Sequence, residues 1–166
     1  TSSAPFRESE AVSEVEARLA ALGVVLPDVA APLAAYVPAV RAGDLVWTSG
    51  QLPTLAGGLL ATGKVGADVT AEQAADLARY CALNALAAIK AEIGDLDLVQ
   101  RVVKVVGFVA SEPSFTGQPA VINGASELIG TAFGDAGRHA RSAVGVAVLA
   151  LDAPVESVYR LQVDTA

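Results

Sequence analysis

The sequence predicts an α+β fold in which helices cover one face of a mixed β-sheet. Helical and strand-like patterns alternate along the chain in the order α-ββ-α-β-α-ββ. The chain has 166 residues and is 53% apolar, which is enough for one substantial core. Only 17% of its residues are charged, a low fraction for a domain that stands alone, so we expect a homo-oligomer.

The N-terminal part of the chain predicts a tail, a helix and a connection. After a tail at residues 1–8, apolar residues recur at helical spacing over residues 9–22, and Gly23 ends the pattern. A connection containing prolines follows. We therefore expect residues 1–35 to form this extension and residues 36–166 to form a single domain.

A β-hairpin is predicted at the start of that domain. Tyr36–Arg41 and Leu45–Gly50 are β-rich runs on either side of the turn sequence Ala42-Gly43-Asp44. Pro38 restricts the first run to an edge or bulged strand because proline cannot donate a ladder hydrogen bond. The next segment, Leu52–Asp68, is rich in glycine and is predicted as a loop.

The middle of the chain predicts two helices with a strand between them. Thr70 and Gln73 have the spacing of a capping box, which opens a long helix ending at Ile93. Leu98–Ala110 is β-branched and predicts a strand, and Pro119–Phe133 predicts the next helix.

Two apolar runs at the C-terminal end predict neighbouring strands over residues 143–151 and 155–163. The first run has no strongly polar side chain, so both of its faces should be covered, one by helices and the other by a partner chain. Arg141 precedes the first run and Glu156 lies within the second. Neighbouring strands would bring these two residues together at one end of the sheet.

Arg141 and Glu156 are the candidate catalytic pair. The Arg141 guanidinium is a planar fork that matches a carboxylate or a phosphate. Glu156 has the chemistry to orient a water molecule and relay its proton. Two structural interpretations compete with this hypothesis: the two side chains pair with each other, or Glu156 is a solvated strand residue.

Composition argues against several other classes of function. A single cysteine, Cys81, and a single histidine, His139, argue against a zinc site held by the protein alone, and we expect no metal or organic cofactor. The net charge of −7 disfavours nucleic acid as a partner. No apolar stretch is long enough to span a bilayer, and no secretory signal is evident, so we expect a cytoplasmic protein. Ser49 as a nucleophile would need a base, and nothing in the sequence assigns His139 to it.

Several short motifs, taken in order, resemble the Rid family, the reactive-intermediate deaminases also known as YjgF-like or endoribonuclease L-PSP proteins. The motifs are Thr48-Ser49-Gly50-Gln51-Leu52-Pro53, then Gln73 and Asn84, then Asn123, Ala140-Arg141-Ser142 and Glu156. The N-terminal helix resembles that of a longer branch of the family. The resemblance implies a chorismate-mutase-like α+β fold, assembled as a homotrimer with its sites between subunits.

The resemblance also implies hydrolysis of imines or enamines derived from amino acids, which releases ammonia and a 2-oxo acid. Arg141 would hold the substrate carboxylate and Glu156 would position water. Tyr36, Ser49 and Asn123 would line the pocket, with Ala143 where the family often has cysteine. Two other functions stay open: a non-catalytic module that binds a small carboxylate, and an endoribonuclease. Acidic charge and the single histidine disfavour the endoribonuclease.

Overall fold

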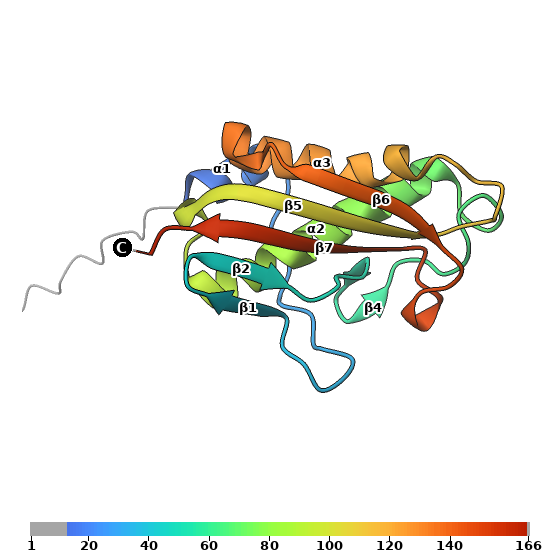
Figure 1. Ribbon diagram of the computed structural model, residues 1–166, viewed down its shortest axis with the longest axis horizontal. Coiled ribbons are helices and arrows are strands. Elements are labelled where there is room, and N and C mark those ends of the chain that lie inside the picture. The colour runs from blue at the N-terminus through green and yellow to red at the C-terminus, as the bar shows by residue number, and fades with distance from the viewer. Residues whose placement is uncertain (1–12, 166) are drawn as a thin grey trace, which may run out of the picture.

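A five-stranded mixed sheet forms the centre of the molecule. The computed structural model describes residues 13–165 of the chain. In spatial order the strands are β1 (Ala39–Ala42), β2 (Leu45–Thr48), β7 (Val155–Val163), β5 (Val99–Ala110) and β6 (Ala140–Val146). Only the β5–β6 pair is parallel. Figure 1 shows helices α2 (Ala71–Ile93) and α3 (Gln118–Phe133) on one side of this sheet. The predicted α+β class is confirmed.

Helix α2 begins at the predicted capping box and packs closely on its neighbours. The Thr70 hydroxyl accepts a hydrogen bond from Gln73 N at 3.1 Å, and the Gln73 side chain accepts one from Thr70 N at 2.9 Å. Gly94 ends the helix with φ +90°, a conformation that suits glycine. Helix α3 approaches α2 so closely that a side chain at Gly124 would collide with the Ala75 carbonyl.

The N-terminal helix α1 (Glu14–Ala21) is attached to the domain by specific contacts. Asp97, in the short 3₁₀ helix η1 (Leu96–Leu98), accepts hydrogen bonds from Glu14 N at 2.8 Å and Val15 N at 3.0 Å. Ser13 caps the same end by accepting from Glu16 N. Residues 9–12 of the predicted helix lie outside the described part of the chain.

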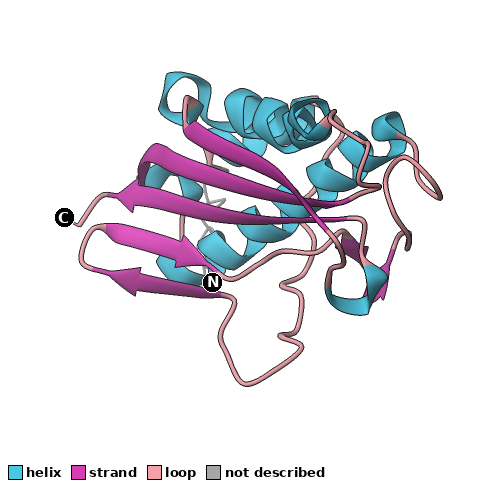
Figure 2. Ribbon diagram, turned by 45° about the vertical axis from the view of Figure 1, so that its right-hand side comes forward, coloured by secondary structure: helices cyan, strands magenta, loops and turns pink. Residues whose placement is uncertain are grey.

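The two faces of the sheet differ in what covers them. Val105 and Val109 of β5 and Tyr159 and Leu161 of β7 face the helices and are buried. The opposite face carries no helix, as the turned view in Figure 2 shows. Large apolar side chains remain exposed on this open face or at its edge, including Val40, Trp47 and Val144, which are 49%, 40% and 44% exposed.

Several predicted boundaries are wrong. Strand β1 begins at Ala39 and not at Tyr36, because the chain before Pro38 makes a series of bends. The predicted strand 143–151 is observed as β6 at residues 140–146, and its apolar end leads into a turn, the 3₁₀ helix η3 (Ala150–Asp152). Another 3₁₀ helix, η2 (Gly134–Gly137), precedes β6.

The segment predicted as one glycine-rich loop contains a small hairpin, β3 (Thr54–Leu55) and β4 (Gly58–Leu59). Ala56, with φ +52°, and Gly57, with φ +83°, form its two-residue turn, which is the backbone geometry of a tight hairpin. Asn84 of α2 ties this segment to the helix layer by donating to the carbonyl oxygens of Leu52 at 3.0 Å and Thr54 at 2.9 Å.

Candidate active site

Arg141 is the second residue of β6, and its side chain turns toward the helices. In the parallel register it lies beside Val105, a buried residue of the helix-facing side. Its Nη1 donates to Asn123 Oδ1 at 2.7 Å and to Ser126 Oγ at 3.3 Å, both on α3. Within residues 13–165 no carboxylate pairs with Arg141. The cation is therefore oriented by neutral acceptors and keeps Nε and Nη2 available for an anion.

Ser126 connects Arg141 to the only histidine of the chain. His139 Nδ1 lies 2.6 Å from the Gly137 carbonyl oxygen, and its Nε2 lies 2.9 Å from Ser126 Oγ. Because a carbonyl can only accept, the neutral ring carries its proton on Nδ1, and Ser126 donates to Nε2. The Ser126 oxygen thereby presents a lone pair to Arg141. Ser126 was not among the predicted site residues, although it follows Asn123 by one helical turn and so shares its face.

Ala143 completes this group of residues. It lies two positions after Arg141 on the same side of β6, opposite Gly107, and is partly buried against the core. We call Arg141, Asn123, Ser126 and Ala143 the arginine half-site.

Glu156 lies on the other side of the sheet. It pairs with Phe108 of β5, whose side chain points to the open face. The carboxylate occupies the position that a Cβ at residue 50 would take, so a side chain there would displace it. Burial raises the pKa of this carboxyl above its usual value. A carboxyl with a raised pKa is suited to accepting and returning a proton near neutral pH.

Ser49 precedes Gly50, on which Glu156 packs, and Tyr36 lines the same cavity as Gly50. Ser49 Oγ donates to the Val37 carbonyl oxygen at 2.5 Å, so its proton serves the backbone. Tyr36 is 45% exposed, and its hydroxyl accepts a hydrogen bond from Leu33 N at 3.3 Å. No base contacts Ser49 among the described residues, which is inconsistent with a nucleophilic serine. We call Glu156, Ser49 and Tyr36 the glutamate half-site.

The expectation that neighbouring strands bring Arg141 and Glu156 together is wrong for a single chain. Strand β5 lies between β6 and β7, and the two side chains point to opposite faces of the sheet. They form no ion pair with each other, so the competing structural interpretation of Arg141 as Glu156's partner is also wrong. The candidate residues instead form two separate half-sites.

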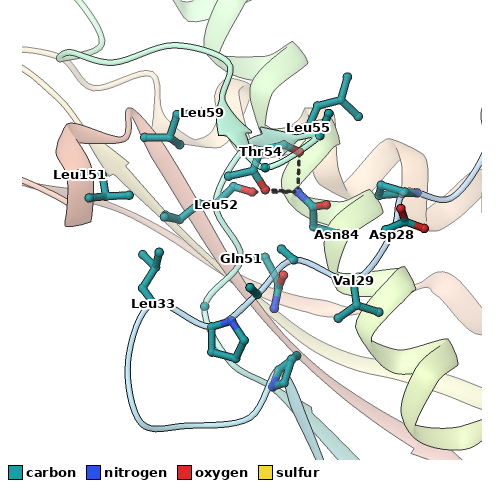
Figure 3. Close-up of a pocket in the computed structure, with 18 of the residues that line it drawn as sticks. Asp28, Val29, Leu33, Gln51, Leu52, Thr54, Leu55, Leu59, Asn84 and Leu151 are labelled. Atoms are coloured by element: carbon teal, nitrogen blue, oxygen red, sulfur yellow. Dashed lines mark hydrogen bonds between the residues drawn. The ribbon is translucent and has the colours of Figure 1, made fainter.

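A cavity of about 690 Å³ lies between the connection before β1 and the segment around β3 and β4. Figure 3 shows its walls, which come from the connection before β1, the segment around β3 and β4, Asn84 of α2 and Leu151. Tyr36 and Gly50 belong to its lining, whereas Arg141 and Glu156 do not. The connection was predicted only as a linker, and no pattern in it indicates a cavity wall.

Residues 13–165 contain neither a cluster suited to a metal ion nor a helix suited to crossing a bilayer. No group of three or more His, Cys, Asp or Glu side chains has the arrangement to hold a metal ion. Likewise, none of the described helices combines the length and apolar character needed to cross a bilayer. Cys81 is fully buried, and burial raises the pKa of its thiol far above the usual value.

Comparison with known proteins places the chain among proteins of the same fold. It is 49% identical to Protein TCP17 of Trypanosoma cruzi over 147 residues, which cover 88% of this chain and 92% of that protein. The crystal structure of Atu1372 from Agrobacterium tumefaciens, a protein with unknown function, is 49% identical and superposes with a TM-score of 0.85, covering 91% of this chain and 93% of that one.

A more distant structure is named for its family. RidA from the Antarctic bacterium Psychrobacter sp. PAMC 21119 is 25% identical, with a TM-score of 0.58 over 82% of this chain and 94% of that one. Residues 16–161 match the family described as "YjgF/chorismate_mutase-like, putative endoribonuclease". Together with the strand order and the motifs around Gly50 and Arg141, these matches show that the chain belongs to the YjgF/Rid family.

Proposed function

We propose that this protein hydrolyses imines or enamines derived from amino acids and releases a 2-oxo acid and ammonia. Arg141 of one copy grips the substrate carboxylate, and Glu156 of a neighbouring copy positions the attacking water. The active assembly is a homotrimer with one such site at each interface, and the reaction needs no metal or organic cofactor.

The observation that carries this proposal is the state of Arg141. Its guanidinium is held by the neutral oxygens of Asn123 and Ser126, and no carboxylate among the described residues neutralises it. A half-buried cation oriented in this way, with N–H groups to spare, is suited to a small anion that arrives from outside the chain.

The two half-sites explain why more than one copy is required. Arg141 lies on the edge strand β6, and Glu156 faces the open, apolar side of the sheet. Exposed side chains such as Val144 and Trp47 on or beside that side provide apolar surface for a partner. Because β6 is an edge strand, a second copy packed at this edge would bring its own glutamate half-site toward the arginine half-site of the first.

The chemistry then follows from the two charges. Water adds to the iminium carbon while the Glu156 carboxylate takes one of its protons, which forms a carbinolamine. Glu156 returns that proton to the nitrogen and then takes the hydroxyl proton of the carbinolamine, so that the C–N bond breaks and ammonia leaves as the C=O bond forms. Fixing the anion beside an aligned water supplies much of the rate, because imines are intrinsically reactive. Asn123 and Ala143 shape the arginine side of the pocket, and Tyr36 and Ser49 shape the other side.

Substitution of Arg141 tests the proposal. With freshly generated 2-aminoacrylate, we expect Arg141→Ala to lower kcat/KM for ammonia release by about a hundredfold or more, because two charge-assisted hydrogen bonds are lost. Arg141→Lys should recover little, because an ammonium cannot make the bidentate contact. No acceleration by the wild-type protein, or full activity of Arg141→Ala, would sink the proposal.

Co-expression of two inactive variants tests the division between copies. Arg141→Ala and Glu156→Gln each remove one half-site, but a mixed ring contains interfaces at which both half-sites are intact. Random mixing in a trimer restores about a quarter of the sites. Activity near that level supports shared sites, whereas activity no greater than that of the separate variants contradicts them.

The same assays distinguish the rival functions. A non-catalytic module would bind a 2-oxo acid saturably, in a manner dependent on Arg141, without releasing ammonia. An endoribonuclease would cleave RNA in a manner dependent on the same residue. The net charge of −7 makes the protein repel a phosphate backbone, which favours the small anion as its ligand.

A further inference from the structure

The cavity described above has apolar walls that come from two separate segments. Residues 26–33 of the connection form one wall, and residues 50–59 form the other. Figure 3 shows Leu33, Leu52 and Leu151 gathered on one side, with Asp28 and Val29 on the other. Asp28 supplies the single charged side chain of the lining, so the cavity is suited mainly to an apolar group.

The wall formed by residues 50–59 is held in place by hydrogen bonds within the protein. Asn84 is 2% exposed and donates to the carbonyl oxygens of Leu52 and Thr54, which holds the β3–β4 segment against α2. On the opposite side, Leu26 at the start of the wall packs against the core, and Ser49 donates to the Val37 carbonyl oxygen beyond its end. The cavity is therefore a formed feature of the fold and does not depend on closure around a guest.

The cavity adjoins the glutamate half-site. Tyr36 and Gly50 line the cavity, and the Glu156 carboxylate packs directly on Gly50. A substrate carbon placed beside Glu156 would thus have the cavity next to it. Its carboxylate would extend the other way, toward Arg141 of the neighbouring copy.

We propose that this cavity receives the side chain of the substrate, so that the protein prefers imines and enamines with a bulky apolar side chain, branched or aromatic, over small ones. This inference rests on the proposed deaminase function. A volume of about 690 Å³ exceeds what a methyl group can fill. A bulky side chain would leave water for apolar walls, whereas a methyl group would leave most of the cavity wet.

The first experiment compares substrates on the wild-type protein. Imines are generated in situ by an L-amino-acid oxidase from leucine, phenylalanine, alanine or lysine, and hydrolysis is measured against trapping by semicarbazide. We expect kcat/KM for the leucine and phenylalanine products to exceed that of the alanine product by about tenfold or more. A preference for the cationic lysine product would overturn the apolar assignment and point to Asp28.

A pair of matched variants locates the preference. Leu33 lines the cavity and is 57% exposed, whereas Leu60 is 42% exposed and lies outside the lining. Leu33→Trp should fill the cavity and abolish the preference, because kcat/KM should fall much more for the bulky imines than for the alanine product. Leu60→Trp should behave like the wild type, and circular dichroism of both variants checks that the fold is kept.

The outcomes separate this inference from the function on which it rests. Turnover that depends on Arg141 but shows no preference for bulky imines, or a preference that survives Leu33→Trp, overturns the cavity assignment and leaves the deaminase proposal standing. No turnover of any imine overturns both.

Discussion

At the scale of single residues, the orientation of the Arg141 guanidinium is set by its neighbours on α3. Asn123 and Ser126 both accept from the same nitrogen, Nη1, which sets the plane of the guanidinium. His139 Nε2 accepts a hydrogen bond from the Ser126 hydroxyl, which leaves a lone pair of the serine oxygen directed toward the arginine. We infer that Ser126 is a positioning residue that acts through Arg141.

Ser126→Ala should therefore weaken the proposed activity without unfolding the protein. Loss of the hydroxyl removes one acceptor from Arg141, and we expect kcat/KM to fall about fivefold, which corresponds to about 1 kcal/mol. The loss should appear mainly in KM, because the carboxylate grip is affected and Glu156 is not. Ser126→Thr retains the hydroxyl and should recover most of the activity. Equal activity of wild type and Ser126→Ala would contradict the positioning role.

Glu156 gives a second prediction at this scale, on stability and pH. Burial raises its folded-state pKa above 4.5, so ionisation of the carboxyl costs free energy in the folded state that it does not cost in the unfolded chain. The contribution of Glu156 to stability must therefore fall as pH rises through the interval from 4.5 to the raised pKa. Below this interval the carboxyl is protonated in both the folded and the unfolded state, so Glu156 costs no stability there.

Glu156→Gln removes the ionisation. We expect the variant to be more stable than the wild type at pH 7 and the difference to vanish toward pH 4. Chemical denaturation across this pH range measures the free energy of unfolding of both proteins. Glu127→Gln, at an exposed position of α3, is the control. A constant difference between wild type and Glu156→Gln at all pH values would show that ionisation is not its cause.

At the scale of secondary-structure elements, local signals predicted the fold better than they predicted the site. The capping box at Thr70 and the β-branched run up to Ala110 specify their elements locally, and both were correctly placed. Strand β6 was misplaced because residues 147–151 are apolar yet lie in a turn, and only tertiary context distinguishes the two.

The site itself depended on information that no local pattern contains. The sequence identified Arg141 and Glu156, but it could not show that β5 lies between their strands, because spatial order is set by long-range pairing. It also missed Ser126 and the wall formed by residues 26–33.

The junction between α1 and η1 allows a prediction for an element. Asp97 accepts from two backbone N–H groups at the start of α1, where a negative charge also suits the helix dipole. We expect Asp97→Ala to lower the free energy of unfolding by about 1–2 kcal/mol. Hydrogen exchange should show faster exchange in α1, while the β5 amides stay protected. Asp97→Asn keeps one acceptor, so its free energy of unfolding should lie between those of the wild type and Asp97→Ala.

At the scale of the whole molecule, the open face of the sheet governs assembly. A face with exposed apolar side chains from β1, β2 and β6 is unusual for a chain that stands alone. It accords with the low charged fraction of the sequence, 17%, and with the proposed trimer.

A charge on this face should disrupt assembly. Val144 of β6 is 44% exposed, and we expect Val144→Glu to shift the mass in sedimentation equilibrium toward the 16.7 kDa of a single chain. Ammonia release should fall in parallel, because each proposed site needs two copies. Val25→Glu, at a residue that is 85% exposed in the connection, should change neither property. An unchanged mass for Val144→Glu would exclude this face as the interface.

The position of β6 in the sheet has one more consequence, for motion. This strand has hydrogen-bonded pairing on one side only, and it enters the sheet through the crossover helix that supplies the acceptors of Arg141. Fraying of a border strand is among the cheapest openings available to a folded chain. Any such excursion would release the guanidinium from its acceptors in a single event. An anion that contacts both β6 and the neighbouring copy would then hold β6 in the sheet. Substrate binding and the ordering of this edge strand would become one process.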